Sequence, residues 1–288
     1  MKSQKSAMFE NTSCLYLVPT PIGNLEDITL RALRILKEAD IIAAEDTRNT
    51  KKLCNYFEIT TPLMSYHEHN TETGGDKILH LLAEGKTIAL VSDAGTPCIS
   101  DPGVDIVNKA LAMNYAVVPL PGANAGITAL IASGLSPQPF YFYGFLSRQK
   151  KERKKELQQL AKRQETLIFY EAPHRLKEML QHTFEEFGNR RVVLARELTK
   201  KFEEFLRGTL EESVCWVNES EVRGEFCIII EGTNDIVSEE EPWQHFSVSE
   251  HVQHIIEETQ ISSKEAIKEV AKIRGISKRD VYQAYHIN

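Results

Sequence analysis

Three short loops rich in glycine and proline hold the residues best suited to bind a ligand. They are PTPIGN at residues 19–24, DAGTPCISDPG at 93–103 and PGANAG at 121–126, and each follows a run of apolar residues. Glycine lets the backbone approach a ligand closely or adopt positive φ, whereas proline stiffens the path and removes a backbone donor. One such loop is common in any α/β protein, but three of them favour a binding site.

The absence of two common sequence patterns limits the kinds of ligand that these loops can bind. Neither GxxxxGK[ST] nor GxGxxG occurs, so the phosphate-binding and ordinary dinucleotide fingerprints are absent. A loop that contains Pro97 and Pro102, with few consecutive backbone amides, suits a neutral, flat group joined to a polar amino-acid end. S-adenosylmethionine is compatible with this description.

The elements that must position these loops alternate between strand and helix. Apolar runs and helical spacing predict a mostly parallel sheet covered on both faces, and such sheets bind ligands beyond the carboxyl ends of their strands. We expect Asp27, Thr47 and Asp101 to cap the helices that follow them. Strands are expected at residues 14–20, 40–44, 63–67, 87–92 and 116–119, and helices at 28–38, 49–57, 76–84, 102–113 and 125–133.

A second α/β domain is expected after GLSPQP at residues 134–139, because this segment interrupts the alternation and predicts a domain boundary. The first domain is therefore assigned to residues 13–134 and the second to residues 135–234. In the second domain, strands are expected near residues 140–143, 166–170, 191–197 and 226–231, and helices near 148–162, 174–187 and 210–217.

The last part of the chain differs from the rest. An acidic linker, DIVSEEEP at residues 235–242, precedes a tail assigned to residues 243–288. Three short helices are expected there, in an order that resembles a helix-turn-helix. They are placed at residues 247–258, 263–274 and 278–286.

Composition excludes several classes of protein. The chain has 288 residues and a net charge of −7, so it does not bind nucleic acid by bulk attraction. Any RNA contact must come from local patches, such as residues 148–163, which hold eight Lys or Arg against two Glu. No apolar run approaches the roughly 20 residues that span a bilayer, and the first 13 residues lack the apolar core of a signal peptide. We therefore expect a cytoplasmic protein.

The five cysteines are scattered through the chain. They form no CxxC pair and have no histidine at the spacing of metal ligands, so neither a disulfide framework nor a zinc site is expected.

Seven segments, in order from about residue 15 to 232, resemble the tetrapyrrole-methylase superfamily. Within it they resemble the rRNA small-subunit methyltransferase I subfamily, which 2′-O-methylates a cytidine in the decoding region of 16S rRNA. The tail SSKEAIKEVAKIRGISKRDVYQAY is similar to the helical C-terminal domain of that subfamily. The segments are VPTPIGNLEDITLRALRILKEADIIAAEDTR, VSDAGTPCISDPG, LPGANAGITALIASGL, YGFL, LIFYEAPHRL, VVLARELTK and RGEFCIIIEG.

The resemblance implies an α/β fold of two domains, with S-adenosylmethionine in the cleft between them, plus a small helical C-terminal domain. It also implies a reaction without a metal, a homodimer, and 16S rRNA or the small ribosomal subunit as partner. Ser147 departs from the pattern, since the family usually has Pro after GFL, which puts the stiffness of this interdomain loop in question. The cofactor-binding residues implied are Pro21, Asp93, Ala94, Gly95, Thr96, Pro97, Ile99, Gly122, Ala123, Tyr170, Ala172, Gly224 and Glu225.

Methyl transfer to a ribose hydroxyl needs alignment of oxygen, carbon and sulfur, and removal of a proton. Orientation of the reactants can lower the activation free energy by about 7–11 kcal/mol. A general base can raise the rate by about 10²–10⁴-fold. We therefore expect positioning to dominate, with Glu171 or Asp46 as the base. Glu45, Asp93, Asp101 and His174 are further candidates, for which helix capping, loop hydrogen bonds or packing are competing explanations.

The basic stretch that follows the YGFL segment is the expected RNA contact, although such a helix face is usually only solvated. The residues assigned to RNA are Arg148, Lys150, Lys151, Arg153 and Lys154.

Two other functions stay open at this point. One is a methyltransferase that acts on a tetrapyrrole or another small molecule, against which the helical tail and the ribosomal motifs argue. The other is a non-catalytic nucleic-acid-binding module whose α/β part senses a ligand. Turnover of the cofactor, and the salt dependence of RNA binding, distinguish these functions.

Overall fold

The computed structural model describes residue 4, residues 13–233, residue 243 and residues 246–286. The chain divides into two compact units after Thr233. The predicted acidic linker at 235–242 lies outside the described residues. Within those residues, no helix combines the length and the apolar character that crossing a membrane requires.

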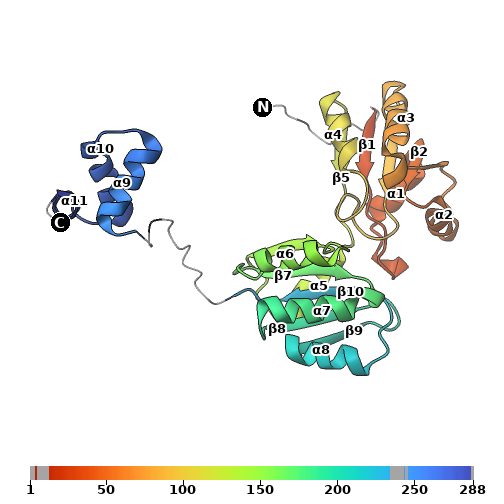
Figure 1. Ribbon diagram of the computed structural model, residues 1–288. Coiled ribbons are helices and arrows are strands. Elements are labelled where there is room, and N and C mark those ends of the chain that lie inside the picture. The colour runs from red at the N-terminus through yellow and green to blue at the C-terminus, as the bar shows by residue number, and fades with distance from the viewer. Residues whose placement is uncertain (1–3, 5–12, 234–242, 244–245, 287–288) are drawn as a thin grey trace. The chain divides into compact units, whose positions relative to one another are not determined.

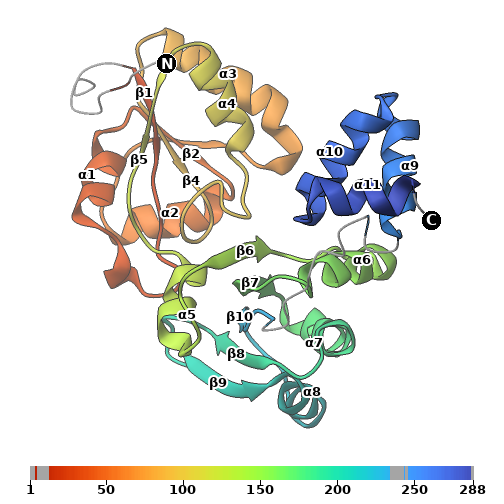
Figure 2. The ribbon, with the colours of Figure 1, turned by 90° about the vertical axis from the view of Figure 1, so that its left-hand side faces the viewer.

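The first sheet is entirely parallel, as the sequence predicts. Its strand order is β3-β2-β4-β1-β5 (Figure 1). The strands are nearly continuous apolar runs because helices cover both faces: α1 and α2 pack on one side and α3 and α4 on the other (Figure 2). The bounds are β1 (Cys14–Leu17), α1 (Leu30–Glu38), β2 (Ile41–Ala44), α2 (Thr47–Tyr56), β3 (Leu63–Ser65), α3 (Thr71–Ala83), β4 (Ile88–Val91), α4 (Val104–Ala112) and β5 (Ala116–Pro119).

The capping residues of α1 and α2 differ from the predicted ones. Thr29 caps α1 through a hydrogen bond from the Ala32 N–H at 3.0 Å, and Asp27 lies in a preceding 3₁₀ turn. Asp46, one residue before the expected Thr47, caps α2 by accepting a backbone N–H at 2.8 Å. Both predictions were wrong by one or two residues because each helix start offers several capping side chains in a row.

The second sheet is mixed, with the order β6-β7-β10-β8-β9. Its β6 and β7 are parallel, and the other neighbours are antiparallel. Side chains of β10 alternate: Ile228 packs towards α6, α7 and α8, whereas Ile229 packs towards α5. The bounds are α5 (Ala125–Ser133), β6 (Phe140–Gly144), α6 (Lys150–Leu160), β7 (Thr166–Glu171), α7 (Pro173–Phe187), β8 (Arg191–Arg196), β9 (Glu204–Thr209), α8 (Leu210–Glu219) and β10 (Phe226–Ile230).

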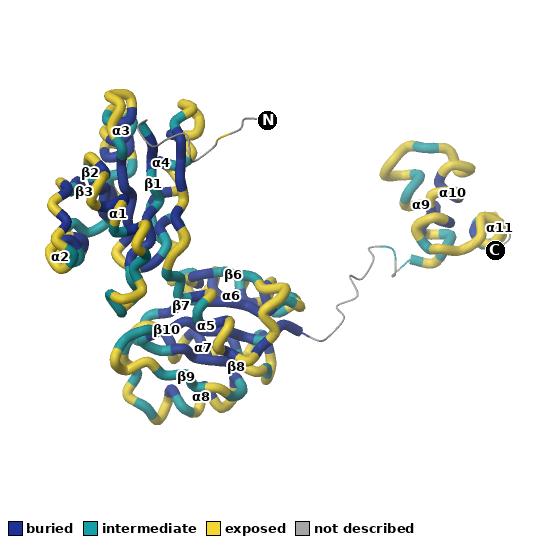
Figure 3. The backbone as a smooth tube through the Cα atoms, turned by 180° about the vertical axis from the view of Figure 1, so that it is seen from behind, coloured by how far each residue is buried: buried dark blue, intermediate teal, exposed yellow. Residues whose placement is uncertain are grey.

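Two features of this half differ from the sequence-based expectation. Strand β9 was not predicted, because it is a half-exposed edge strand without an apolar alternation. Helix α5, expected in the first domain, packs on the second sheet through Ala129 and Leu130. We therefore propose that the boundary between the two α/β halves lies just before Ala125 rather than at residue 134. Buried residues concentrate in the strands of both sheets (Figure 3).

The tail forms the three predicted helices: α9 (Val248–Thr259), α10 (Ser263–Arg274) and α11 (Lys278–His286). They share a small core that includes Val252, Val270 and Val281. Gly275, with φ +65°, ends α10 in the left-handed conformation and leaves a short turn before α11.

The loop that carries Ser147 is held by specific hydrogen bonds. The Ser147 N–H donates to Glu156 Oε2 at 2.8 Å, a bond that proline in the same place could not make. The Ser147 carbonyl also accepts hydrogen bonds from Arg153 and Arg175. Hydrogen bonds thus restrain the loop at the position where the sequence resemblance led us to expect proline.

Arg153 is buried, which contradicts its assignment to an RNA-binding surface. Its side chain is 3% exposed, and its guanidinium lies 2.7 Å from a carboxylate oxygen of Glu178. Its Nε donates to His182 Nδ1 at 3.2 Å. Burial and Arg153 lower the pKa of His182, so the ring stays neutral and can accept this bond. Arg153 therefore fixes α6 to α7.

We expect Arg153→Ala to lower the free energy of unfolding by about 1–3 kcal/mol, because it leaves the buried His182 nitrogen without its donor. Lys151→Ala, which removes an exposed cation from the same helix, should change that free energy by less than about 0.5 kcal/mol. Urea unfolding followed by circular dichroism measures both. Equal, small losses would show that Arg153 does not anchor the helix.

Candidate active site

The strand order of the first sheet brings the three glycine and proline loops together. Strands β4, β1 and β5 are parallel neighbours, so the loops that follow them leave the same edge of the sheet. Thr20 and Gly95 exchange two backbone hydrogen bonds of 2.9 Å, which join the first two loops. Thr96 Oγ1 donates to the Ala123 carbonyl at 2.9 Å and joins the second loop to the third.

Gly95 is required at its position for two reasons. Its φ is +81°, a conformation that residues with a side chain rarely adopt. A Cβ there would also lie 3.1 Å from Ile22 Cγ2 and 3.4 Å from the Ala123 carbonyl oxygen. The three loops therefore close around a position that only glycine fits without strain.

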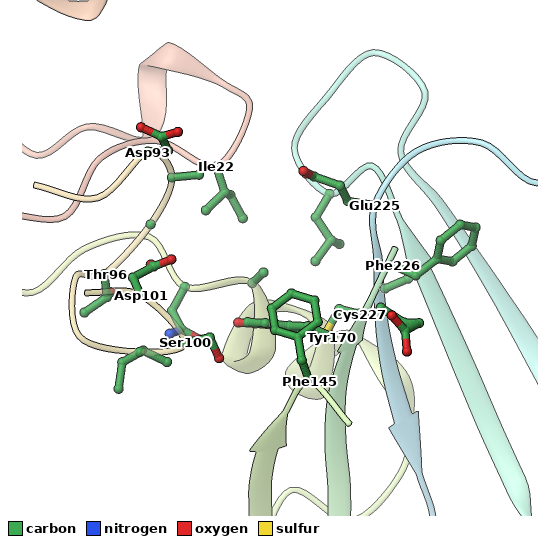
Figure 4. Close-up of a pocket in the computed structure, with 18 of the residues that line it drawn as sticks. Ile22, Asp93, Thr96, Ser100, Asp101, Phe145, Tyr170, Glu225, Phe226 and Cys227 are labelled. Atoms are coloured by element: carbon green, nitrogen blue, oxygen red, sulfur yellow. The ribbon is translucent and has the colours of Figure 1, made fainter. Parts of the chain in front are cut away.

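A cavity of about 340 Å³ lies between these loops and the second sheet. Figure 4 shows Ile22, Asp93, Thr96 and Asp101 on one wall, and residues of the second half on the other. The second wall comes from the ends of β7 and β8 and from the start of β10, which are adjacent because β10 runs antiparallel to both. It contains Tyr170, Glu171, Ala172, Ala195, Glu197, Leu198, Lys200, Glu225, Phe226 and Cys227.

Aromatic side chains form the floor of the cavity. The rings of Phe145 and Tyr170 meet edge to face, with centroids 5.7 Å apart. The Tyr170 hydroxyl accepts a hydrogen bond from the Gly126 N–H at 2.9 Å, which ties β7 to the start of α5. The floor is thus apolar and is held in place by contacts within the second half.

The walls carry a strong excess of negative charge. Six carboxylates line the cavity, and Lys200 is the single cation among the described lining residues. Lys200 Nζ lies 3.0 Å from Glu197 and 3.1 Å from Glu225, so its charge is already compensated. The remaining lining carboxylates are Glu45, Asp93, Asp101 and Glu171. Such a cavity favours a ligand that carries positive charge.

Burial raises the pKa of three of these carboxyl groups. Burial, reinforced by the neighbouring charge of Glu45, raises the pKa of Asp101 to about 7. Burial raises the pKa of Glu171, whereas the Ala172 N–H and Arg175 oppose the change. Burial likewise raises the pKa of Glu45. Raised carboxyl pKa values in a cavity are typical of functional sites.

Asp101 does not cap α4, which corrects the expectation from the sequence. The residue that precedes α4 is Gly103, with φ +140°, and no side chain caps this helix. Cys98 and Ser100 in the same loop also have positive φ, +70° and +64°. The backbone therefore turns sharply before the helix begins, and Asp101 lies on the cavity wall.

Most of the cofactor-binding residues expected from the sequence line the cavity, and the rest lie behind its wall or beside it. Pro21 lines a second hollow of about 400 Å³ next to α2. Pro97 is buried, Ala123 accepts the Thr96 bond, and Gly122 packs on the ring of Pro19. Gly224 packs against Glu197. The expected residues that line the cavity are Asp93, Ala94, Gly95, Thr96, Ile99, Tyr170, Ala172 and Glu225.

The sequence reasoning missed the segment 197–200 that follows β8. Glu197, Leu198 and Lys200 line the cavity. Their position directly after a strand was a usable signal, but the antiparallel pairing that brings β8 beside β7 through β10 could not be deduced from the sequence.

The two expected bases are in different surroundings. Glu171 is 2% exposed and lines the cavity. Asp46 does not line it: its carboxylate caps α2 and lies 2.7 Å from Arg48, which lowers the pKa of Asp46 to about 2. Asp46 therefore stays charged outside the cavity. Of the residues assigned to RNA, Arg148, Lys150, Lys151 and Lys154 are exposed.

Comparison with known proteins agrees with this arrangement. Residues 14–213 match the family described as Tetrapyrrole (Corrin/Porphyrin) Methylases. Ribosomal RNA small subunit methyltransferase I of Bacillus subtilis (strain 168) is 61% identical over 275 residues, which cover 95% of this chain and 94% of that protein. The protein of the same name from Halalkalibacterium halodurans is 57% identical over 99% of both chains.

Solved structures share the fold at low sequence identity. Cobalt precorrin-4 methyltransferase, a cobalamin biosynthetic enzyme, aligns with a TM-score of 0.59 and 17% identity over 76% of this chain and 95% of its own. Uroporphyrin-III C-methyl transferase from Thermus thermophilus, complexed with S-adenyl homocysteine, aligns with a TM-score of 0.54 and 20% identity over 76% of this chain and 97% of its own. These matches confirm the expected two-part α/β architecture. Together with the family match and the close relatives, they establish that the chain belongs to the tetrapyrrole methylase family and, within it, to the ribosomal RNA small subunit methyltransferase I group.

Proposed function

We propose that this protein transfers a methyl group from S-adenosylmethionine to small-subunit ribosomal RNA, at the ribose 2′-oxygen of a cytidine in the decoding region. The observation that carries the proposal is the acid-lined cavity at the ends of β4 and β7, in a chain 61% identical to a protein named as a ribosomal RNA methyltransferase. The cytidine and its 2′-oxygen come from the resemblance of the sequence motifs.

The residues present fit S-adenosylmethionine. The cavity volume of about 340 Å³ lies in the range of small-molecule sites. Its carboxylates complement a ligand with positive charge on a sulfur and on an amino group. Glu171 Oε2 is buried and has no hydrogen-bond partner among the described residues, which leaves one oxygen available to a bound cation.

Residues from both halves would hold this ligand. Gly95 and Thr96 would contact it from the loop after β4, Tyr170 and Ala172 from the end of β7, and Glu225 from the start of β10. When bound, it supplies a methyl group on a positively charged sulfur. The chain itself contributes orientation, because the Thr20–Gly95 and Thr96–Ala123 hydrogen bonds fix the loops before any ligand arrives.

Glu171 is the carboxylate whose position is best fixed. Its Oε1 accepts the Ala172 N–H at 2.9 Å and lies 3.2 Å from Arg175 Nε. We propose that its negative charge faces the positive end of the methyl donor and orients it. In this role Glu171 acts through its charge and keeps its place throughout the reaction.

RNA would approach along the segment that follows β6. Phe145 lines the cavity, and the exposed cations Arg148, Lys150 and Lys151 begin three residues later. Lys154 is also exposed but is paired with Glu186 at 3.1 Å. We therefore assign the phosphate contacts to the first three cations.

We also propose a homodimer that works in the cytoplasm, where its ribosomal substrate would be found. The family resemblance supports both statements. Leu30, Ile131 and Phe202 are 87%, 74% and 69% exposed, which leaves apolar surface that a second copy could cover. Sedimentation velocity measures the association.

The substrate is tested by incubating the protein with labelled S-adenosylmethionine and small ribosomal subunits that lack the modification. Digestion of the RNA to nucleosides should yield labelled 2′-O-methylcytidine. Free 16S rRNA is tested in parallel, because the two substrates differ in the shape that RNA-binding proteins recognise. Label in a porphyrinoid but not in RNA would overturn the proposal in favour of a small-molecule substrate.

We expect Gly95→Ala to weaken S-adenosylmethionine binding about tenfold or more, measured by calorimetry. Its Cβ would crowd Ile22 and Ala123 and displace the loop. Gly85→Ala is the matched control, because Gly85 has φ +85° but no atom within 4 Å of an added Cβ. Both changes should cost about 1–2 kcal/mol of backbone strain, so only a difference in affinity supports the role of Gly95.

Replacement of Arg148, Lys150 and Lys151 by glutamine should weaken RNA binding and reduce its salt dependence. Each phosphate contact contributes about 0.7 to the slope of log K against log salt for single strands, so the slope should fall by about 2. Replacing Arg31, Lys37 and Lys77, which are also exposed, removes the same charge elsewhere. An equal effect of the two triple variants would contradict a specific RNA path.

A further inference from the structure

The loop of residues 98–103 presents Asp101 to the cavity, across from Tyr170 (Figure 4). We propose that Asp101 is the catalytic residue that accepts the proton of the ribose 2′-hydroxyl during methyl transfer. The proposal rests on the proposed function and selects Asp101, a further candidate base in the sequence analysis for which helix capping was the competing explanation, over Glu171 and Asp46.

Asp101 differs from the other carboxylates of the cavity in its hydrogen bonds. Five of the six are already bound to an N–H group or a cation, whereas the Ser92 hydroxyl is the partner found for Asp101 within the described part of the chain. On the first wall, Glu45 accepts the Asp93 N–H, and Asp93 accepts the Asp46 N–H and the Asn49 amide. On the second wall, Glu171 accepts the Ala172 N–H and pairs with Arg175. Lys200 pairs with both Glu197 and Glu225, and Glu197 also accepts the Glu225 N–H.

The backbone of the loop provides an independent observation. Cys98 and Ser100 are not glycine, yet both have positive φ. A Cβ on Gly103 would lie 2.5 Å from Cys98 Sγ, so the loop is closed tightly on itself. Ser100 Oγ would lie 2.8 Å from a Cβ on Gly144 at the end of β6, which shows that the loop is also packed against the second half. Strained conformations of this kind persist where the surrounding structure enforces them, often at functional sites.

The electrostatic surroundings of Asp101 suit proton transfer near neutral pH. The titratable groups that interact with it are Glu45, Asp93, Cys98 and Tyr170, and none of these is a cation. Burial, Glu45 and Asp93 together raise the pKa of Asp101 to about 7. A base with a pKa near the working pH combines a useful ionised fraction with the strongest affinity for a proton.

The proposed step is balanced. The ribose oxygen forms a bond to the methyl carbon as the bond between that carbon and sulfur breaks, and the sulfur keeps the electron pair. The hydroxyl proton passes to the Asp101 carboxylate and then to water. Glu171, fixed by Arg175, keeps its charge against the donor and takes no proton.

The test compares Asp101→Asn, Asp101→Glu and the wild-type protein in single-turnover methyl transfer, with protein and cofactor in saturating excess over RNA, across pH 5.5–9. The wild-type rate should fall about tenfold per unit below pH 7. Asp101→Asn should lower the rate about 10²–10⁴-fold and remove that pH dependence, whereas Asp101→Glu should restore part of both. Asp105→Asn is the control, because Asp105 is an exposed carboxylate of α4 and should leave the rate unchanged.

Two measurements without turnover separate a proton acceptor from a structural residue. Affinity for S-adenosylmethionine should change less than about threefold in Asp101→Asn. Because the pKa of Asp101 in the folded protein lies above its ordinary value of 3.8, ionisation above pH 7 costs stability. The melting temperature of Asp101→Asn should therefore equal or exceed that of the wild type at pH 8.

Three results would overturn the proposal. They are an unchanged rate and pH profile in Asp101→Asn, a loss of cofactor affinity, and a lower melting temperature at pH 8. In each of these cases the wild-type protein still methylates RNA, so the proposed function stands while the role of Asp101 fails. If the wild-type protein transfers no methyl group to RNA, both proposals fail.

Discussion

The architecture of the site depends on the pair of backbone hydrogen bonds between Thr20 and Gly95. These bonds join the loops of two adjacent parallel strands just beyond the sheet, where a bond of 3.2 Å from Thr20 Oγ1 to the Ser92 carbonyl supports them. The pair requires Gly95 in a left-handed conformation and places Ile22 within van der Waals reach of it. Thr96 then extends the connection to Ala123. One wall of the cavity is thus fixed by backbone and short side chains, without any large residue.

The carboxylates on the two walls of the cavity have different kinds of partner. On the wall from the second sheet, Lys200 compensates Glu197 and Glu225, and Arg175 lies beside Glu171. On the wall from the first sheet, the hydrogen-bond partners of Asp93 and Asp101 are neutral within the described residues, and Arg48, which does not line the cavity, acts on Asp93 through its charge alone. The less compensated charge therefore lies on the side of the first sheet.

The sequence predicts the first sheet and its loops well, because glycine and proline at the ends of apolar runs mark the ends of strands, and this signal is local in the sequence. It fails where packing between distant segments decides the outcome. The sequence predicts that Arg153 lies on a solvated basic helix face, but the structure shows that Glu178 and His182 of α7 bind it. The sequence predicts that helix α5 ends the first domain, but in the structure this helix packs on the second sheet. Lys200 lies beside the cavity only because β10 pairs with both β7 and β8.

The failed prediction at Asp101 is the most informative one, because it concerns a strong local rule. Aspartate before proline at a helix start normally caps the helix, and such a cap contributes about 0.5–2 kcal/mol. In this protein α4 begins after Gly103 without any side-chain cap, and two non-glycine residues of the same loop adopt positive φ. The loop thus departs from its most stable local arrangement at Cys98, at Ser100 and at the uncapped start of α4, all next to the cavity. Such departures are expected where a segment is shaped for a site rather than for its helix, and the side chain released from capping is the one that reaches the cavity wall.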